Sequence, residues 1–171
     1  APITEKTAPV MASKRAESSN RSKPSTISNI VTKFSFATKG GVAPHKPFKT
    51  NQDAFLTNPH MIQTSHSHFF SVCDGHGHNG HDVSGLLKKR LALNIEQQLR
   101  SKLKNLGDDY PDPELMEACL IKGFEESNKE IYNSGIDIRF SGSTCVSMLT
   151  YGRKLYTANV GDSRAIMVRA Q

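Results

Sequence analysis

Three aspartates, Asp53, Asp74 and Asp162, each lie where an apolar, strand-like run meets a polar or glycine-containing turn. A carboxylate in such a position is held by the strand and still faces solvent. Mg²⁺ and Mn²⁺ take oxygen ligands and keep several of their waters. These positions therefore suit a hard divalent cation, although aspartate is also common at strand ends because it favours turns.

The segment Asp74-Gly75-His76-Gly77 carries the strongest chemical signal in the chain. Two glycines around His76 let the backbone approach a ligand closely. The Asp74 carboxylate and the Gly75 carbonyl are hard oxygen ligands, and the His76 imidazole two residues away is a candidate proton donor. The segment therefore indicates metal-assisted chemistry with a histidine acid.

Two other kinds of site remain open for the same segment. His76, His78 and His81, together with His66 and His68, offer imidazoles to zinc, but their spacings match no familiar zinc site. His66 and His68 lie in a polar stretch and are expected at the surface. A loop that binds nucleotide phosphates is the other alternative, but the chain contains no Gly-Lys-Ser/Thr element.

The elements that must position these residues follow from hydrophobic periodicity. Six strands are predicted, over residues 32–36, 53–57, 68–73, 143–151, 154–160 and 163–169. The last three are joined by hairpin-sized links, Gly152-Arg153 and Gly161-Asp162. Phe34 and Phe36 alternate with polar residues and are expected on one face of the first strand.

Two helices are predicted between the strands. An apolar residue recurs every four positions over residues 82–105, and Gly107 closes this helix. The second begins at Asp112-Pro113, where aspartate is a good N-cap and proline suits the first turn, and it ends at Ser134-Gly135. Strands, two helices and a strand meander indicate an α+β fold with an antiparallel sheet covered by helices.

Charge is concentrated at the N-terminus of the 171-residue chain. The net charge is +6, but residues 1–33 hold six basic and two acidic side chains, a balance of +4. The other 138 residues contribute only +2, so the charge is poor evidence for nucleic-acid binding. Residues 1–29 are predicted to be a flexible, basic, Ser/Thr-rich tail, which either keeps the chain soluble or serves as a phosphorylation target or docking arm.

Composition bounds the remaining classes. No run approaches the ~18 apolar residues of a membrane span, and the first residues lack the pattern of a signal peptide. The three cysteines, Cys73, Cys119 and Cys145, are odd in number and far apart, so a disulfide framework is not expected. We expect an intracellular protein, cytoplasmic or nuclear, that is monomeric and binds neither nucleic acid nor a membrane.

Four elements resemble the metal-dependent type-2C protein phosphatases over roughly residues 30–169. They are Asn51-Gln52-Asp53-Ala54, Asp74-Gly75-His76-Gly77 with Gly80-His81 and Val83-Ser84, Gly142-Ser143-Thr144, and Ala158-Asn159-Val160-Gly161-Asp162-Ser163-Arg164-Ala165. The resemblance implies a serine/threonine phosphoprotein phosphatase. It also implies an antiparallel β-sandwich flanked by helices, in α-β-β-α layers.

The resemblance also implies roles for single residues. Asp74 would bridge two Mg²⁺ or Mn²⁺ ions and the Gly75 carbonyl would contact one of them. Asp53 and Gln52 would support the metals or their waters. His76 would protonate the departing serine or threonine oxygen. Asp162 is similar to an aspartate associated with a weaker third metal.

Two positions depart from the family pattern. Many members have glutamate where Gln52 stands. Many also place a phosphate-contacting arginine five residues before the first aspartate, where this chain has Phe48. The neighbouring Lys49 would then contact the phosphate, as a point charge without the fork of arginine.

The family completes its metal site with two further aspartates, in Asp-Gly and Asp-Asn elements that would follow residue 171. Residues 30–171 are therefore expected to be the N-terminal portion of a catalytic domain, which alone binds metal weakly and hydrolyses phosphate esters negligibly. The alternative is a truncated or degenerate phosphatase-like module that binds phosphoproteins or partners without catalysis.

Overall fold

A computed structural model describes residues 29–42, 44–45, 49–103 and 110–169. The predicted tail, residues 1–29, lies outside the described residues except for Asn29, whose side chain contacts His68. The elements in chain order are β1 (Asp53–Asn58), the 3-10 turn η1 (Met61–Gln63), β2 (Ser67–His76), α1 (Gly80–Lys102), α2 (Pro113–Tyr132), β3 (Gly142–Ser143), β4 (Cys145–Tyr151) and β5 (Lys154–Val160).

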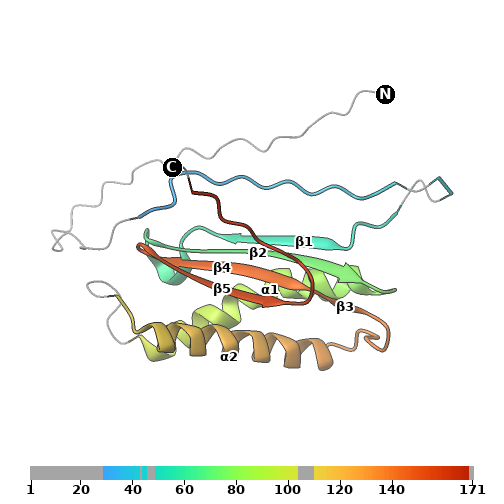
Figure 1. Ribbon diagram of the computed structural model, residues 1–171. Helices are drawn as coiled ribbons and strands as arrows, with labels where there is room; N and C mark the ends of the chain where they lie inside the picture. Colours follow the sequence, from blue (N-terminus) through green and yellow to red (C-terminus); the bar gives the residue numbers. More distant parts are fainter. Residues whose placement is uncertain (1–28, 43, 46–48, 104–109, 170–171) are drawn as a thin grey trace.

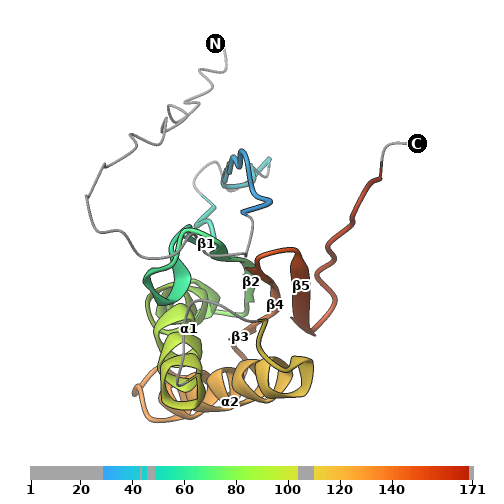
Figure 2. The same cartoon turned by 90° about the vertical axis from the view of Figure 1, so that its left-hand side faces the viewer.

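The strands form one antiparallel sheet in the order β1-β2-β4-β5, with the short β3 paired to the end of β2. Figure 1 shows the strands β1, β2, β4 and β5 side by side in this order, and Figure 2 shows both helices on one face of the sheet. The prediction of an antiparallel sheet covered by helices is confirmed. No helix of the described residues is long and apolar enough to cross a membrane.

The core lies between the sheet and the two helices. Side chains from α1 and α2 meet alternate residues of β2 and β4, because successive strand residues point to opposite faces. Burial of each large apolar side chain there contributes about 1.5–3 kcal/mol. The residues of this core that solvent does not reach are Met61, Phe69, Leu91, Ile95, Leu99, Met116 and Leu149.

α1 and α2 cross closely at Gly123. A Cβ built on Gly123 would lie 2.9 Å from the Ile95 Cα atom, so glycine is needed for the helices to approach this far. Next to the crossing, the Asn94 side-chain amide donates a hydrogen bond of 3.1 Å to the Ser127 hydroxyl. The Asp112 carboxylate accepts a hydrogen bond from the Glu114 N–H and caps α2, as the sequence predicts.

The prediction of a strand over residues 32–36 is wrong. The segment is extended but forms no backbone ladder, and it lies across the face of the sheet opposite the helices (Figures 1 and 2). Its aromatic rings make the contact: Phe34 packs against Phe70 with centroids 5.2 Å apart, and Phe36 stacks on Phe55 at 4.3 Å. The alternation therefore correctly predicted a common face for the two phenylalanines.

The prediction of a strand over residues 163–169 is also wrong. The segment has no regular structure, and Ile166, Met167 and Val168 are more than four-fifths exposed. A strand requires a neighbour with which to exchange backbone hydrogen bonds, and the described residues offer this segment none. Of the expected sandwich, the described part of the chain therefore contains one sheet and the helices on its outer side.

Candidate active site

Asp53 and Asp74 lie directly opposite each other on β1 and β2, and both are exposed. Their side chains share one face of the sheet because they form a cross-strand pair. Partial loss of solvent around Asp53, the negative charge of Asp74 and a hydrogen bond to Asp74 raise the pKa of the Asp53 carboxyl above its ordinary value. Two carboxylates held this close repel each other, and a bound cation would relieve the repulsion.

Lys49 lies near this pair. Its ammonium charge acts on Asp53 and lowers the pKa of that carboxyl, against the larger effects that raise it. The role of Lys49 as a phosphate contact stays a prediction. Phe48, the position at which many relatives of the resembled family have arginine, lies outside the described residues.

Gln52 fixes the backbone around the predicted metal ligands. Its carbonyl accepts hydrogen bonds from the Gly75 N–H at 3.1 Å and from the Ser84 hydroxyl at 2.6 Å. Its side-chain amide donates to the Gly77 carbonyl at 2.6 Å. Two of these contacts hold the Asp74–Gly77 segment, and the third holds the start of α1 against the same backbone group. Support of the metals or their waters by Gln52 stays a prediction.

The backbone of this segment packs too tightly for other residues. A Cβ on Gly75 would meet the carbonyl groups of Gln52 and Gly80. Gly77 has φ +82°, a conformation that residues with a Cβ rarely adopt, and its α-carbon faces the Phe140 carbonyl. The glycines are therefore required by close backbone contacts within the protein as well as by any ligand.

His76 is the last residue of β2, two positions after Asp74, and its side chain is exposed. It pairs with Gly142 of β3, and a Cβ on Gly142 would lie 2.8 Å from the His76 Nε2 atom. The imidazole thus lies over a residue that has no side chain, where it is open to solvent and to a substrate. This arrangement suits proton transfer by His76.

The zinc alternative gains no support from the described residues. His66 and His68 are buried at the opposite end of β2, so their predicted surface position is wrong. His78 and His81 are exposed, and His81 lies 3.5 Å from the Asp82 carboxylate. Within the described ranges, no three His, Cys, Asp or Glu side chains gather as a metal site.

Asp162 lies in the turn after β5 and is exposed. The structure does not group it with Asp53 and Asp74 as a three-residue cluster. The two regions are connected through Thr144, whose hydroxyl accepts a 3.1 Å hydrogen bond from the Asp74 N–H and bonds the Ser163 hydroxyl. Thr144 and Ser84 are positioning residues whose roles the sequence did not predict, although both lie within motifs of the resembled family.

The donor set fits Mg²⁺ or Mn²⁺ in kind. Asp53, Asp74 and the Gly75 carbonyl offer hard oxygen ligands at one end of the sheet, and no sulfur or imidazole competes among them. Two adjacent carboxylates carry too little negative charge for two divalent ions. Among the described residues, this donor set is therefore too small to hold two divalent ions.

Comparison with known proteins defines first the fold. A serine-threonine phosphatase 2C from Toxoplasma gondii has a similar fold, with a TM-score of 0.57 and 20% identity over 68% of this chain and 40% of that chain.

Sequence comparison then identifies the family. The Protein phosphatase 2C family model matches residues 40–171. The Arabidopsis thaliana protein named Probable protein phosphatase 2C 35 is 33% identical over 78% of this chain and 35% of its own length. Probable protein phosphatase 2C 9 from the same organism is 32% identical over 88% of this chain and 48% of its own length. The chain belongs to the protein phosphatase 2C family, and it spans less than half the length of these relatives.

Proposed function

We propose that this chain forms part of a metal-dependent protein phosphatase that hydrolyses phosphoserine and phosphothreonine in proteins. The observation that carries the proposal is the Asp53–Asp74 pair, opposed across two strands on the same sheet end as the exposed His76. Family membership supports the same activity.

Asp53, Asp74 and the Gly75 carbonyl would hold Mg²⁺ or Mn²⁺, and Asp162 would assist a further, weaker ion. When bound, these ions would neutralise charge on the phosphoryl oxygens and activate water for attack. Lys49 would bind a phosphoryl oxygen electrostatically. Gln52, Ser84 and Thr144 would keep the ligand-bearing backbone rigid, since each hydrogen bonds to it or to its supports.

His76 would act as the general acid. The leaving group is a serine or threonine alkoxide, which departs poorly unless it is protonated. The imidazole is exposed over Gly142, so a bound phosphoresidue could approach it from solvent. No covalent intermediate is required, and Cys73 next to Asp74 is buried within the core.

The general-acid role is tested by leaving group. In the full-length natural protein with Mn²⁺, we expect His76→Asn to lower kcat for a phosphothreonine peptide about 10²–10⁴-fold. Hydrolysis of p-nitrophenyl phosphate should fall much less, because nitrophenolate leaves without a proton. His60→Asn, at an exposed histidine in the turn before η1, is the control. Equal losses on both substrates would contradict the role of His76.

Residues 1–171 alone should bind Mn²⁺ weakly and hydrolyse either substrate negligibly, because Asp53 and Asp74 cannot balance two ions. Strong Mn²⁺-dependent turnover by these residues would contradict this proposal. A second candidate function is a phosphatase-like module that binds phosphoproteins without catalysis. Phosphopeptide binding by the full-length natural protein, without turnover of any phosphoester, would favour that module.

We also propose phosphoprotein substrates, an intracellular location and a monomeric state. The location is supported by Cys73, Cys119 and Cys145, which are all free and buried. Free thiols persist in reducing compartments and tend to form disulfides outside the cell.

A further inference from the structure

The loop between α2 and β3 (residues 133–141) lies beside the turn that follows His76. The Asn79 N–H donates a 2.9 Å hydrogen bond to the Ser141 hydroxyl, and the Asn79 side-chain amide donates one of 2.9 Å to the Asp137 carbonyl. The Phe140 carbonyl lies against Gly77. Two hydrogen bonds and a close backbone contact therefore attach the loop to the turn that follows His76.

Phe140 is the most exposed large apolar side chain of the described residues, at 88%. It contributes nothing to the core, and its backbone alone attaches the loop to Gly77. Single exposed apolar residues are ordinary on protein surfaces. Phe140 differs in its location, since it precedes by two residues the Gly142 over which the His76 imidazole lies.

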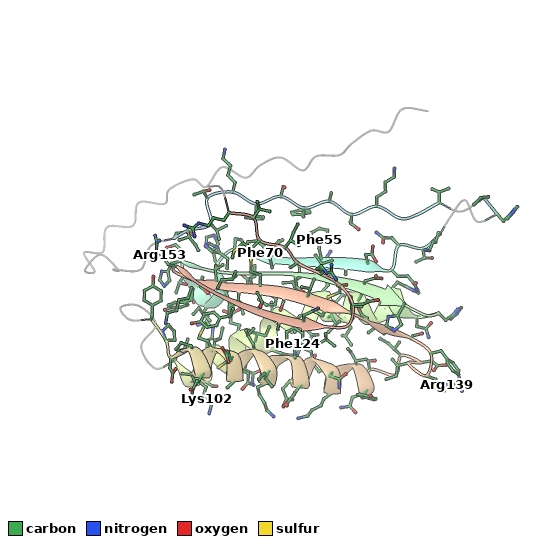
Figure 3. The ribbon with its side chains drawn as sticks, in the orientation of Figure 1. Phe55, Phe70, Lys102, Phe124, Arg139 and Arg153 are labelled. Carbon is green, nitrogen blue, oxygen red and sulfur yellow. The ribbon has the colours of Figure 1, made fainter. Side chains whose placement is uncertain are left out.

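The charges of the loop tip are balanced. The Arg139 guanidinium forms two hydrogen bonds with the Asp137 carboxylate, of 3.0 and 2.7 Å. Figure 3 shows Arg139 at the end of the molecule where β2 and β3 end. Because this basic group already has a carboxylate partner, the distinctive group that the tip offers to a ligand is the aromatic ring of Phe140.

Two residues of extended chain span at most about 7 Å. The Phe140 Cα atom is therefore within that distance of Gly142 and close to His76. A phosphoresidue bound at His76 would carry its own neighbours past this loop, and an extended peptide covers the same distance in two or three residues.

We propose that Phe140 contacts an apolar residue of the phosphoprotein substrate, within about three positions of the phosphoserine or phosphothreonine. The contact makes the loop a specificity determinant for the sequence around the phosphate. This inference rests on the proposed phosphatase function. It requires a substrate longer than a single phosphoester, so small substrates do not use the contact.

The test uses two phosphothreonine peptides of otherwise identical sequence. Within three positions of the phosphothreonine, one peptide carries leucine and the other carries serine. In the full-length natural protein with Mn²⁺, we expect Phe140→Ala to lower kcat/KM for the leucine peptide roughly tenfold, with a smaller loss for the serine peptide. Phe140→Leu should retain most of the preference. Tyr132→Ala, at a 70% exposed aromatic residue at the end of α2, should change neither value.

A second readout does not depend on turnover. Benzoylphenylalanine placed at position 140 should cross-link to the leucine phosphopeptide on irradiation, and the same group at position 132 should not. Normal peptide hydrolysis with no cross-link at 140 and no effect of Phe140→Ala would overturn the inference and leave the phosphatase function intact. A cross-link from 140 only to the protein's own chain would also overturn it. Failure to bind or hydrolyse any phosphoester would overturn both.

Discussion

Asp53 and Asp74 hold like charges opposite each other, and this residue pair is the centre of the proposed metal site. Removal of one charge should weaken cation binding and have little effect on the stability of the fold, because both side chains are exposed. We expect Asp74→Asn to lower Mn²⁺ affinity of the full-length natural protein at least about tenfold, measured by isothermal titration calorimetry.

The matched control is Asp82→Asn, at an exposed aspartate in the first turn of α1. This variant removes the same charge eight residues further along the chain and should leave Mn²⁺ affinity unchanged. Equal losses in the two variants would show that net charge attracts Mn²⁺ and would exclude a specific site at Asp74.

His66 gives the protein an acid-sensitive residue away from the site. Burial lowers the pKa of its imidazole, its Nε2 atom has no hydrogen-bond partner, and its ring meets Tyr151 edge-on at 5.0 Å. Below the ordinary histidine pKa the unfolded chain binds a proton that the folded chain resists, so the free energy of unfolding should fall as pH drops through about 6.5.

Urea unfolding of the protein at pH 7.5 and 5.5 measures this loss. His66→Phe keeps an aromatic ring against Tyr151 and cannot be protonated, so we expect a smaller difference between the two pH values. His68, buried nearby with a lowered pKa, should leave some pH dependence in that variant. An unchanged pH dependence in His66→Phe would exclude His66 as its source.

Candidate residues of the site could be proposed from the sequence to the extent that their chemistry is local. Asp74, Gly75 and His76 are adjacent in the chain, and Asp53 was found because it ends a similar polar turn. The contacts of Gln52 could not be predicted, since they depend on the register of β1 with β2 and on the position of α1. The burial of His66 and His68 follows from packing on Tyr151, Pro59 and Asn29, which the polar local sequence conceals.

At the scale of elements, Gly123 and Gly85 make a controlled pair within the two helices. Alanine in a helix interior is favoured over glycine by about 1 kcal/mol. At Gly85 nothing lies within 4 Å of a built Cβ, so we expect Gly85→Ala to stabilise the protein by about 0.5–1 kcal/mol.

At Gly123 the added methyl group would meet the Ile95 side chain and backbone where α1 and α2 cross. Overpacking of a core costs about 1–3 kcal/mol, more than the helix propensity returns. We therefore expect Gly123→Ala to destabilise the protein by about 1–2 kcal/mol in urea unfolding. Stabilisation of both variants by similar amounts would contradict the close helix crossing.

The elements with a strong period were predicted from the sequence to within a few residues. Both helices and the strands β1, β2, β4 and β5 have an apolar face that packs in the core, and this face is what the sequence pattern records. Residues 32–36 and 163–169 have a similar pattern but form no strand. Alternation indicates which side chains share a face, and it cannot indicate whether a second strand is available to pair with the backbone.

At the scale of the whole molecule, the two faces of the sheet differ. The helices cover one face, whereas residues 29–42 cross the other and leave Val72 half exposed. The segment is attached at three points along its length: Asn29 contacts His68, the two phenylalanines contact β1 and β2, and the Thr38 hydroxyl accepts a hydrogen bond from Asn51. Since Asn51 also caps the Asp53 N–H, this segment is connected to the candidate site.

Phe34 and Phe36 should therefore stabilise the protein across the sheet even though they are 43% and 45% exposed. Each aromatic pair contributes about 0.5–1.5 kcal/mol beyond its buried area, so the double variant Phe34→Ala/Phe36→Ala should lose about 2–3 kcal/mol of unfolding free energy. Tyr132→Ala removes an aromatic side chain without such contacts and should stay within about 0.5 kcal/mol of the parent protein. If urea unfolding gave the same midpoint for the parent and the double variant, residues 29–42 would not pack on the sheet in solution, and their connection to Asp53 through Asn51 would be lost as well.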